Sequence, residues 1–151
     1  MQIQLSQKER MYLEDGKIQE GICVQKYQKY AQQAQDPQLK QLFNKIATEE
    51  QHHLDTINQL LQGQQPNLAH PQQQQQNQTP SQGTMNNEND KNLCIDLLST
   101  EKHVSSNYDI AVFESANPVV RQAFQHIQQD EQRHGEELFN YMNSHGMYNV
   151  K

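Results

Sequence analysis

Apolar side chains recur along this chain at intervals of three, four and seven residues, which is the period of an α-helix with one buried face. Four stretches show the pattern, so the sequence predicts four helices and an all-α fold. Their expected inward stripes are Leu13, Glu20, Cys23, Val24, Tyr27, Ala31 and Ala34; Leu39, Phe43, Ile46, Glu50, His53, Ile57 and Leu60; Leu97, Glu101, Val104, Tyr108 and Val112; and Val120, Phe124, Ile127, Glu131, His134, Leu138 and Tyr141.

Capping and turn residues mark the ends of these helices. A Ser or Asn followed three residues later by an acid predicts a helix start. An acid or amide before proline predicts a tight reversal, because that residue avoids helical angles while proline suits the first helical position. Glycine predicts a helix stop. The predicted helix starts are Ser6 with Glu9 and Asn87 with Asp90. The predicted reversals are Asp36-Pro37 and Asn117-Pro118, and the predicted stops are Gly63 and Gly146. The third helix is expected over about residues 88–116.

The chain reads as two copies of one unit. A shift of 81 residues superposes Glu50-Gln51-His52-His53 on Glu131-Gln132-Arg133-His134, two signatures with Glu and His three positions apart. Side chains at that spacing share one face of a helix. The same shift brings together Glu20 and Glu101, Tyr27 and Tyr108, Pro37 and Pro118, and Phe43 and Phe124, whereas most other positions differ.

This repeat predicts two helical hairpins in one bundle. Sixteen residues, about 24 Å of helix, separate Glu20 from Asp36, and thirteen, about 20 Å, separate Pro37 from Glu50, so both acids should lie at one level. We therefore expect one domain, residues 1–151, with hairpins at 6–63 and 87–146 and a tail at 147–151 that folds back. Residues 64–86, rich in Gln and interrupted by proline, should form a long, mobile crossover linker outside the core.

The composition of the chain argues against several classes of function. The net charge of −6 and the lack of clustered Lys and Arg argue against a nucleic-acid partner. No apolar run approaches the ~18 residues of a membrane span. The amino terminus has neither a basic nor an apolar stretch, so we expect synthesis in the cytosol. Cys23 and Cys94 are not repeat partners, and two thiols are too few for a four-thiolate site. No disulfide is expected.

The repeated acids and histidines predict a metal site. Four ionised carboxylates in a bundle core are unfavourable by several kcal/mol each unless cations balance them. Two divalent ions supply that charge, and mixed carboxylate and imidazole ligation suits iron best, with manganese or zinc as alternatives. The symmetry assigns Glu20 and His53 to one ion, Glu101 and His134 to the other, and Glu50 and Glu131 as bridges. A metal-free core is the competing interpretation.

Other polar side chains have simpler expected roles. Tyr27 and Tyr108 lie on the same stripes as the acids, where core packing and a hydrogen-bonding or redox role near the metals are both open. Cys23 is expected to be a small core residue. The remaining histidines, which have no repeat partner or face away from the stripe, are expected at the surface or in solvent: His52, His70, His103, His126 and His145.

These residues resemble known families. Two helices with one Glu each and two with Glu-x-x-His are the inventory of ferritin-like di-metal bundles. The segment 46–53, preceded by Asp36-Pro37, is similar to the second helix of rubrerythrin-type domains. The second half, from Glu101 and Tyr108 through the segments 114–118 and 138–142 to 146–148, is similar to the spore coat protein F family. The resemblance covers nearly the whole chain except the linker.

The resemblance implies two functions of different classes. A coat-type protein would be a structural component of the spore coat with an intact metal site, and its partners would be other coat proteins. A rubrerythrin-like enzyme would act on O2 or H2O2 at a di-iron centre. Val104 stands where rubrerythrins commonly carry another carboxylate, and no rubredoxin domain is present, which argues against peroxidase turnover. A homodimer is open in either case.

Overall fold

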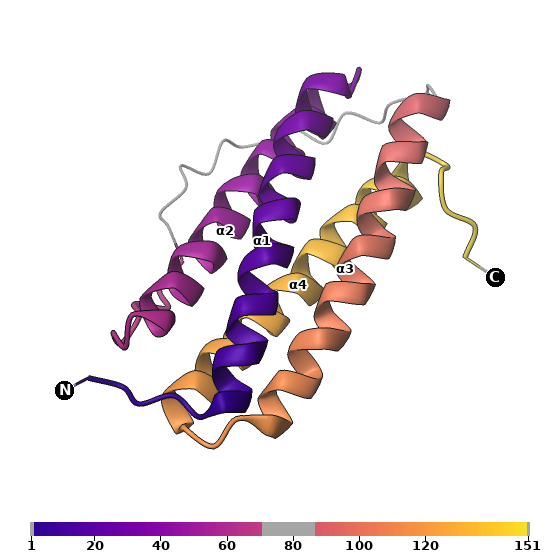
Figure 1. Cartoon of the computed structure of the whole chain (residues 1–151). Coiled ribbons are helices and arrows are strands. Elements are labelled where there is room, and N and C mark those ends of the chain that lie inside the picture. The colour runs from indigo at the N-terminus through magenta and orange to yellow at the C-terminus, as the bar shows by residue number, and fades with distance from the viewer. Residues whose placement is uncertain (1, 71–86, 151) are drawn as a thin grey trace.

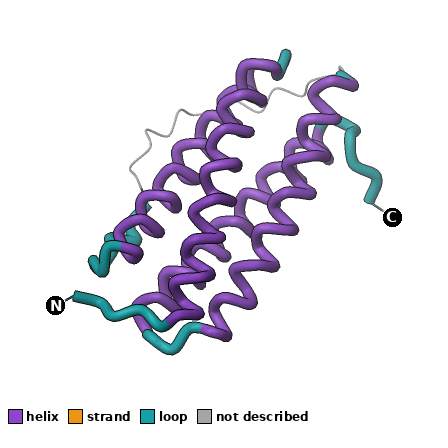
Figure 2. The backbone as a smooth tube through the Cα atoms, in the orientation of Figure 1, coloured by secondary structure: helices purple, strands orange, loops and turns teal. Residues whose placement is uncertain are grey.

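The structure is a computed structural model that describes residues 2–70 and 87–150, and these residues form four α-helices without a strand. The helices are α1 (Gln7–Gln33), α2 (Pro37–Leu61), α3 (Glu88–Glu114) and α4 (Pro118–Ser144). Figure 1 shows α1 beside α2 and α3 beside α4, and Figure 2 shows the short loops that join each pair. The predicted all-α four-helix bundle is thus confirmed. Residues 71–86, most of the expected linker, lie outside the described residues.

Each helix begins where the sequence marks a start. Ser6 and Glu9 form the expected capping box, in which Ser6 Oγ accepts from Glu9 N and Glu9 Oε2 accepts from Ser6 N. Asp36, Asn87 and Asn117 each accept from backbone N–H groups of the helix they precede. These contacts satisfy donors that a helix start leaves free. The third helix ends at Glu114, before residue 116, because the backbone of Ser115 is extended.

Buried acids join the two hairpins at their ends. Glu9, at the start of α1, accepts a hydrogen bond from the backbone of Asn117 in the α3–α4 turn (2.6 Å). Asp90, its repeat partner at the start of α3, accepts from Gln35 (2.9 Å) and Asp36 (3.0 Å) in the α1–α2 turn. The start of each hairpin therefore fixes the turn of the other, which places neighbouring helices antiparallel.

The apolar core forms two clusters, one towards each end of the bundle. Tyr27, Phe43 and Leu97 belong to one, and Leu13 and Phe124 to the other. The predicted stripes are buried with one exception: Val112 is half-buried, and Ala111 faces the core in its place. Between the clusters the interior is polar, because the predicted ligands lie there.

The tail folds back as expected. Met147 is buried, and the ring of Tyr148 lies 5.0 Å from that of Phe139 in an edge-to-face arrangement. His145, expected in solvent, is instead buried: it caps the end of α4 and stacks on Tyr141, four residues earlier, at 4.0 Å between ring centroids. None of the described helices has the length and apolar character needed to traverse a bilayer.

Candidate metal centre

The structure brings the six predicted ligands together in the middle of the bundle. Every one of them is at most 2% exposed: Glu20 on α1, Glu50 and His53 on α2, Glu101 on α3, and Glu131 and His134 on α4. The helical spacing of Glu and His puts both side chains of each signature on the inward face. Four helices thus converge on one buried polar volume.

These side chains form two overlapping groups. Glu20 and His53 make one group with Glu50 and Glu131, and Glu101 and His134 make the other with the same two acids. Within each group the ligand atoms all lie within 4.8 Å of one another. Glu50 and Glu131 stand between the groups, in the position of bridging ligands. Their proximity is observed, while their role in metal binding stays a prediction.

The two imidazoles point one nitrogen each into the centre. His53 Nδ1 lies 3.1 Å from Glu131 Oε1 and 3.4 Å from Glu50 Oε2. His134 Nδ1 lies 2.9 Å from Glu50 Oε1 and 3.9 Å from Glu131 Oε2. Each ring therefore faces both bridging acids with the same atom.

A carboxylate outside the centre holds the far side of each imidazole. His53 Nε2 lies 2.8 Å from Asp130 Oδ2, and His134 Nε2 lies 2.5 Å from Glu49 Oε2. A carboxylate at Nε2 favours the tautomer with its proton there, which leaves the lone pair of Nδ1 for a metal ion. Both carboxylates come from the hairpin opposite their histidine.

Glu49 and Asp130 were not singled out in the sequence, although a signal was present. They occupy the same position in the two repeats, directly before Glu50 and Glu131. An acid repeated beside a ligand is ambiguous, because on one helix it faces about 100° away from that ligand. The structure shows that it turns towards the histidine of the other hairpin.

Two buried tyrosines bind the outer acids. Tyr27 donates to Glu101 Oε1 (2.5 Å) and Tyr108 donates to Glu20 Oε1 (2.6 Å), each across the two hairpins. Burial, and then the charge of these acids, raises the pKa of both phenols well above the ordinary value. Both hydroxyls therefore keep their protons, pack in the core and act as hydrogen-bond donors beside the centre.

The electrostatics of the centre fit bound cations. Burial, and then the charge of Glu50, raises the pKa of Glu20 and of Glu131 well above the ordinary value. Although burial also opposes ionisation of Glu50, hydrogen bonds with Glu20 and His134 hold its pKa well below the usual range. Although burial opposes the charged form of His53, its hydrogen bond to Asp130 and the nearby carboxylate of Glu131 raise its pKa well above the ordinary value. Without metal, protons thus balance the charge.

Buried oxygen atoms without a hydrogen-bond partner also indicate that the centre fits bound cations. Among the described residues, Oε2 of Glu20, Oε2 of Glu101 and both carboxylate oxygens of Glu131 are buried without a hydrogen-bond partner. An unpaired buried polar group of this kind costs about 1–3 kcal/mol or more. Divalent ions would satisfy all four atoms, so the residues present fit a pair of metal ions.

A second polar cluster lies just outside the centre, on the far side of Asp130. His70 Nε2 is 2.7 Å from Asp130 Oδ1, and His126 Nε2 is 3.6 Å from Asp130 Oδ2. His70 is exposed as expected but also contacts this buried acid, whereas the expectation that His126 is solvated is wrong, because its side chain is half-buried beside Asp130. His52 is half-buried, with its Nε2 covered, rather than fully at the surface. His103 is exposed as expected.

The two cysteines are buried and free. Burial, and then the charge of Glu50, raises the pKa of the Cys23 thiol, and burial, followed by the charge of Asp90, raises that of Cys94 to about 12. A protonated, buried thiol is a poor nucleophile. Cys23 therefore serves as a small core residue, one turn from Glu20.

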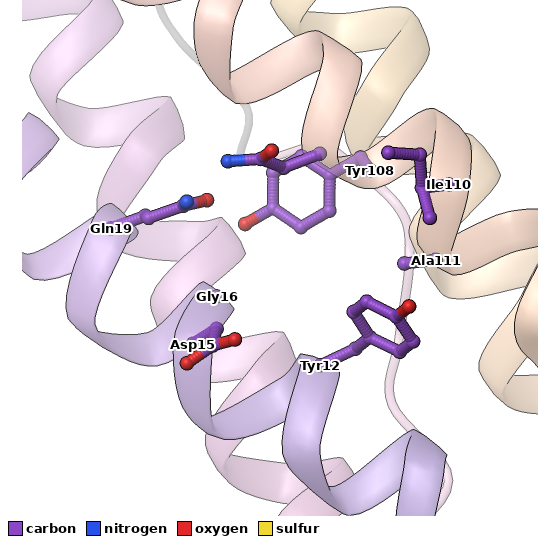
Figure 3. A pocket seen from close by; sticks show the side chains of 8 residues that line it. Tyr12, Asp15, Gly16, Gln19, Tyr108, Ile110 and Ala111 are labelled. Atoms are coloured by element: carbon purple, nitrogen blue, oxygen red, sulfur yellow. The ribbon is translucent and has the colours of Figure 1, made fainter.

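A surface pocket between α1 and α3 reaches one of the two tyrosines. Gly16, Gln19, Tyr108 and Ala111 are among its lining residues. Figure 3 shows the ring of Tyr108 in this pocket above Gly16, with its hydroxyl towards α1. A Cβ at position 16 would lie 3.4 Å from Tyr108 Oη. Tyr108 therefore lines this pocket next to Gly16, although its side chain is only 2% exposed.

Comparisons with known proteins agree with this architecture. The model of the Coat F domain matches residues 89–151. The crystal structure of a two-domain protein with DJ-1/ThiJ/PfpI-like and ferritin-like domains, from Anabaena variabilis, superposes with a TM-score of 0.73 at 16% identity, over 97% of this chain and 40% of that one. At that identity the likeness shows the fold alone. No curated protein matches the chain.

Proposed function

Since residues 89–151 carry a Coat F domain within a ferritin-like bundle, we propose that this chain is a spore-coat component that holds two metal ions. Iron is the best candidate, and manganese and zinc are alternatives, because the ligand set mixes carboxylate with imidazole. The proposed ligands are Glu20, Glu50, His53, Glu101, Glu131 and His134.

One observation carries the metal site. Four acids are buried in a core where four of their oxygen atoms have no partner among the described residues, and both histidines turn a lone-pair nitrogen towards them. A metal-free core would have to retain several protons there. Ions that bind only the folded state would also stabilise it, by about 2.7 kcal/mol at a hundredfold excess over Kd.

Anaerobic titration with Fe(II) tests the site. We expect two ions in the dinuclear centre of the wild type, and two ions fewer per chain in the double variant Glu50→Ala and Glu131→Ala, which removes both bridges. The matched control is Glu14→Ala with Glu136→Ala, two exposed acids on α1 and α4, which should retain both ions. Two ions bound by the bridge variant would refute the assignment.

An oxidoreductase is the second candidate, favoured by Tyr108. Its hydroxyl touches the ligand Glu20, and its ring lines a pocket open to the surface. A bound ferrous pair would supply two electrons, which together with two protons reduce H2O2 to water. The chain's part is to hold the acids in place and keep phenol protons beside them. Val104, apolar where another carboxylate is common in rubrerythrins, argues against efficient turnover.

Addition of O2 or H2O2 to the iron-bound protein distinguishes the structural function from the enzymatic one. Both predict bound iron, whereas only the enzyme predicts that O2 or H2O2 converts it to ferric ion, seen as near-ultraviolet absorbance. Stoichiometric binding without oxidation would remove the enzyme and leave the structural function.

In the coat, the partners would be other coat proteins or a second copy of the chain. Large apolar side chains on the outer faces of α1 and α3 support such contacts; they include Ile18, which is 64% exposed, and Phe113, which is 80% exposed. Light scattering of the purified chain would show whether it forms a homodimer.

A further inference from the structure

Asp130 faces two ways. Its Oδ2 binds His53 of the candidate metal centre, while its Oδ1 lies 2.7 Å from Nε2 of His70, in the segment that follows α2. His126, one turn before Asp130 on α4, brings its Nε2 to 3.6 Å from the same carboxylate. We call His70, His126 and Asp130 the outer histidine cluster.

The geometry of this cluster suits one metal ion. One atom from each of the three residues lies within 4.8 Å of the others. The two imidazole rings are 4.9 Å apart and inclined by 36°, and both present Nε2 to the carboxylate. Ligands of a tetrahedral zinc ion lie about 3.3 Å apart, from bond lengths near 2.0–2.1 Å. Small movements of the side chains would therefore close the site.

An unpaired atom again points to a missing ligand. Nε2 of His126 is buried and has no hydrogen-bond partner among the described residues. Asp130 is itself only 3% exposed, although His70 is partly exposed. The cluster thus combines a buried anion, a buried nitrogen and an open side, where a water molecule could complete the coordination of an ion.

Arg133 is the positive group that opposes a cation here. Its Nη1 lies 3.2 Å from Asp130 Oδ1 and 3.4 Å from Nε2 of His70. The same guanidinium also pairs with Glu49 at 3.0 Å and approaches Glu137 at 3.7 Å. Because two other acids hold it, Arg133 can release Asp130 without becoming an unpaired charge.

We propose that His70, His126 and Asp130 form a third, mononuclear site for a divalent transition-metal ion of the zinc, cobalt or ferrous class. Two imidazoles and one carboxylate suit these ions better than Mg²⁺ or Ca²⁺, which prefer oxygen ligands. An ion there fastens the segment after α2 onto α4. The site needs no ion in the dinuclear centre, because its ligands are separate from the six described above.

Zinc titration of the full chain, after removal of metal by chelation and against a chromophoric competitor, tests this site. His70→Ala is the main variant, since this side chain is 45% exposed and supports no core packing. We expect it to bind one zinc ion fewer than the wild type, with the lost site weakened at least a hundredfold. His103→Ala, which removes an exposed histidine of α3, is the matched control and should keep the full count.

The count distinguishes this proposal from the dinuclear site. Substitution of the two bridging acids should remove the two ions of the dinuclear centre and leave the ion of the outer histidine cluster. His70→Ala should remove only this outer ion, whether or not the dinuclear centre is occupied. Should the dinuclear centre bind nothing, the wild type still binds one ion and the His70 variant none. Equal counts in the wild type and His70→Ala overturn the outer site. So would unchanged ring ¹⁵N resonances of His70 and His126 when zinc is added.

Discussion

The two half-sites of the candidate centre share their inner residues and differ in their surroundings. Glu20, Glu50 and His53 form the first half-site, and Glu101, Glu131 and His134 form the second. The inner contacts agree across the repeat, including the tyrosine that binds each outer acid and the carboxylate that binds each histidine. The same chemistry is thus built twice.

The surroundings differ most at the carboxylates behind the histidines. Glu49, behind His134, pairs with Arg133 at 3.0 Å. Asp130, behind His53, also meets Arg133 but in addition meets the imidazoles of His70 and His126. The position of His126 in the first repeat is Lys45, a cation that could not ligate an ion at neutral pH.

The tyrosines differ in what lies against them. Tyr108 packs beside Gly16 and lines a pocket, whereas the repeat partner of Gly16 is Leu97, fully buried in the same core cluster as Tyr27. The comparison teaches that the inner residues are alike in the two halves of the candidate centre, so any difference between these halves must come from the periphery.

The largest expected effect comes from removal of one outer acid. Glu20→Ala and Glu101→Ala should each lower the metal count by one ion and leave one ion in the dinuclear centre, because each deletes a ligand of one ion and leaves both bridges. The metal-dependent gain in stability should fall by about the contribution of one site, ~2.7 kcal/mol at a hundredfold excess over Kd. Metal analysis and thermal melts with and without Fe(II) measure both.

Equal losses in these two variants would support equivalent half-sites. If one variant loses both ions and the other loses none, the ions share ligands differently from the symmetric assignment.

The second comparison concerns Glu9 and Asp90, the acids that fix the turns at the two ends of the bundle. Glu9→Gln and Asp90→Asn each replace one of two accepting oxygens by an NH2 group, which donates and so leaves one of the two backbone N–H partners without an acceptor. We expect each to lower the free energy of unfolding by about 2 kcal/mol. Denaturant unfolding measures the loss, and an unchanged metal count serves as the control. A loss confined to one variant would show that the hairpins are fastened unequally.

The third comparison is between loaded and metal-free protein as pH changes. In metal-free protein the raised pKa values of Glu20, Glu131, His53 and His134 stabilise the fold at low pH. That contribution is complete below the unfolded values, 4.5 for Glu and 6.5 for His, and is lost as pH rises through the folded values. The lowered pKa of Glu50 contributes stability that is present above the unfolded value of 4.5 and is lost only as pH falls through the lower folded value.

Metal-free protein should therefore melt at a lower temperature at about pH 9 than at about pH 5.5, while loaded protein should change less. Metal binding should release protons, and its apparent Kd should rise as pH falls, by up to about tenfold per unit for each proton displaced. Melting curves and proton release in weak buffer test this. A metal-free protein that is most stable at high pH would contradict the charge balance described above.

The repeat explains how much of this architecture the sequence could predict. Helix ends, the inward stripes and the convergence of Glu20 with Glu50 follow from local capping and helical spacing. The contact of Asp130 with His70 does not, because His70 follows α2 and reaches α4 only through tertiary packing. The burial of His145 is not predicted either, although its spacing of four residues from Tyr141 could have indicated their contact at the end of α4.

The smallest expected effect sharpens the contrast at the tyrosines. In Gly16→Ala the new Cβ would lie 3.1 Å from Ile57 Cδ1 and 3.4 Å from Tyr108 Oη. The end of the Ile57 side chain must therefore shift by a few tenths of an ångström. Alanine gains about 0.5–1 kcal/mol in a helix, which offsets the contact and leaves stability within about 1 kcal/mol. Gly21→Ala, on the same helix with nothing within 4 Å, isolates the gain in helix propensity. If oxidant reaches the iron through the pocket beside Tyr108, Gly16→Ala should slow ferrous oxidation, because its added methyl group narrows this pocket. Gly21→Ala should leave the rate unchanged. Equal oxidation rates for the two variants in stopped-flow absorbance would show that the pocket is not the route.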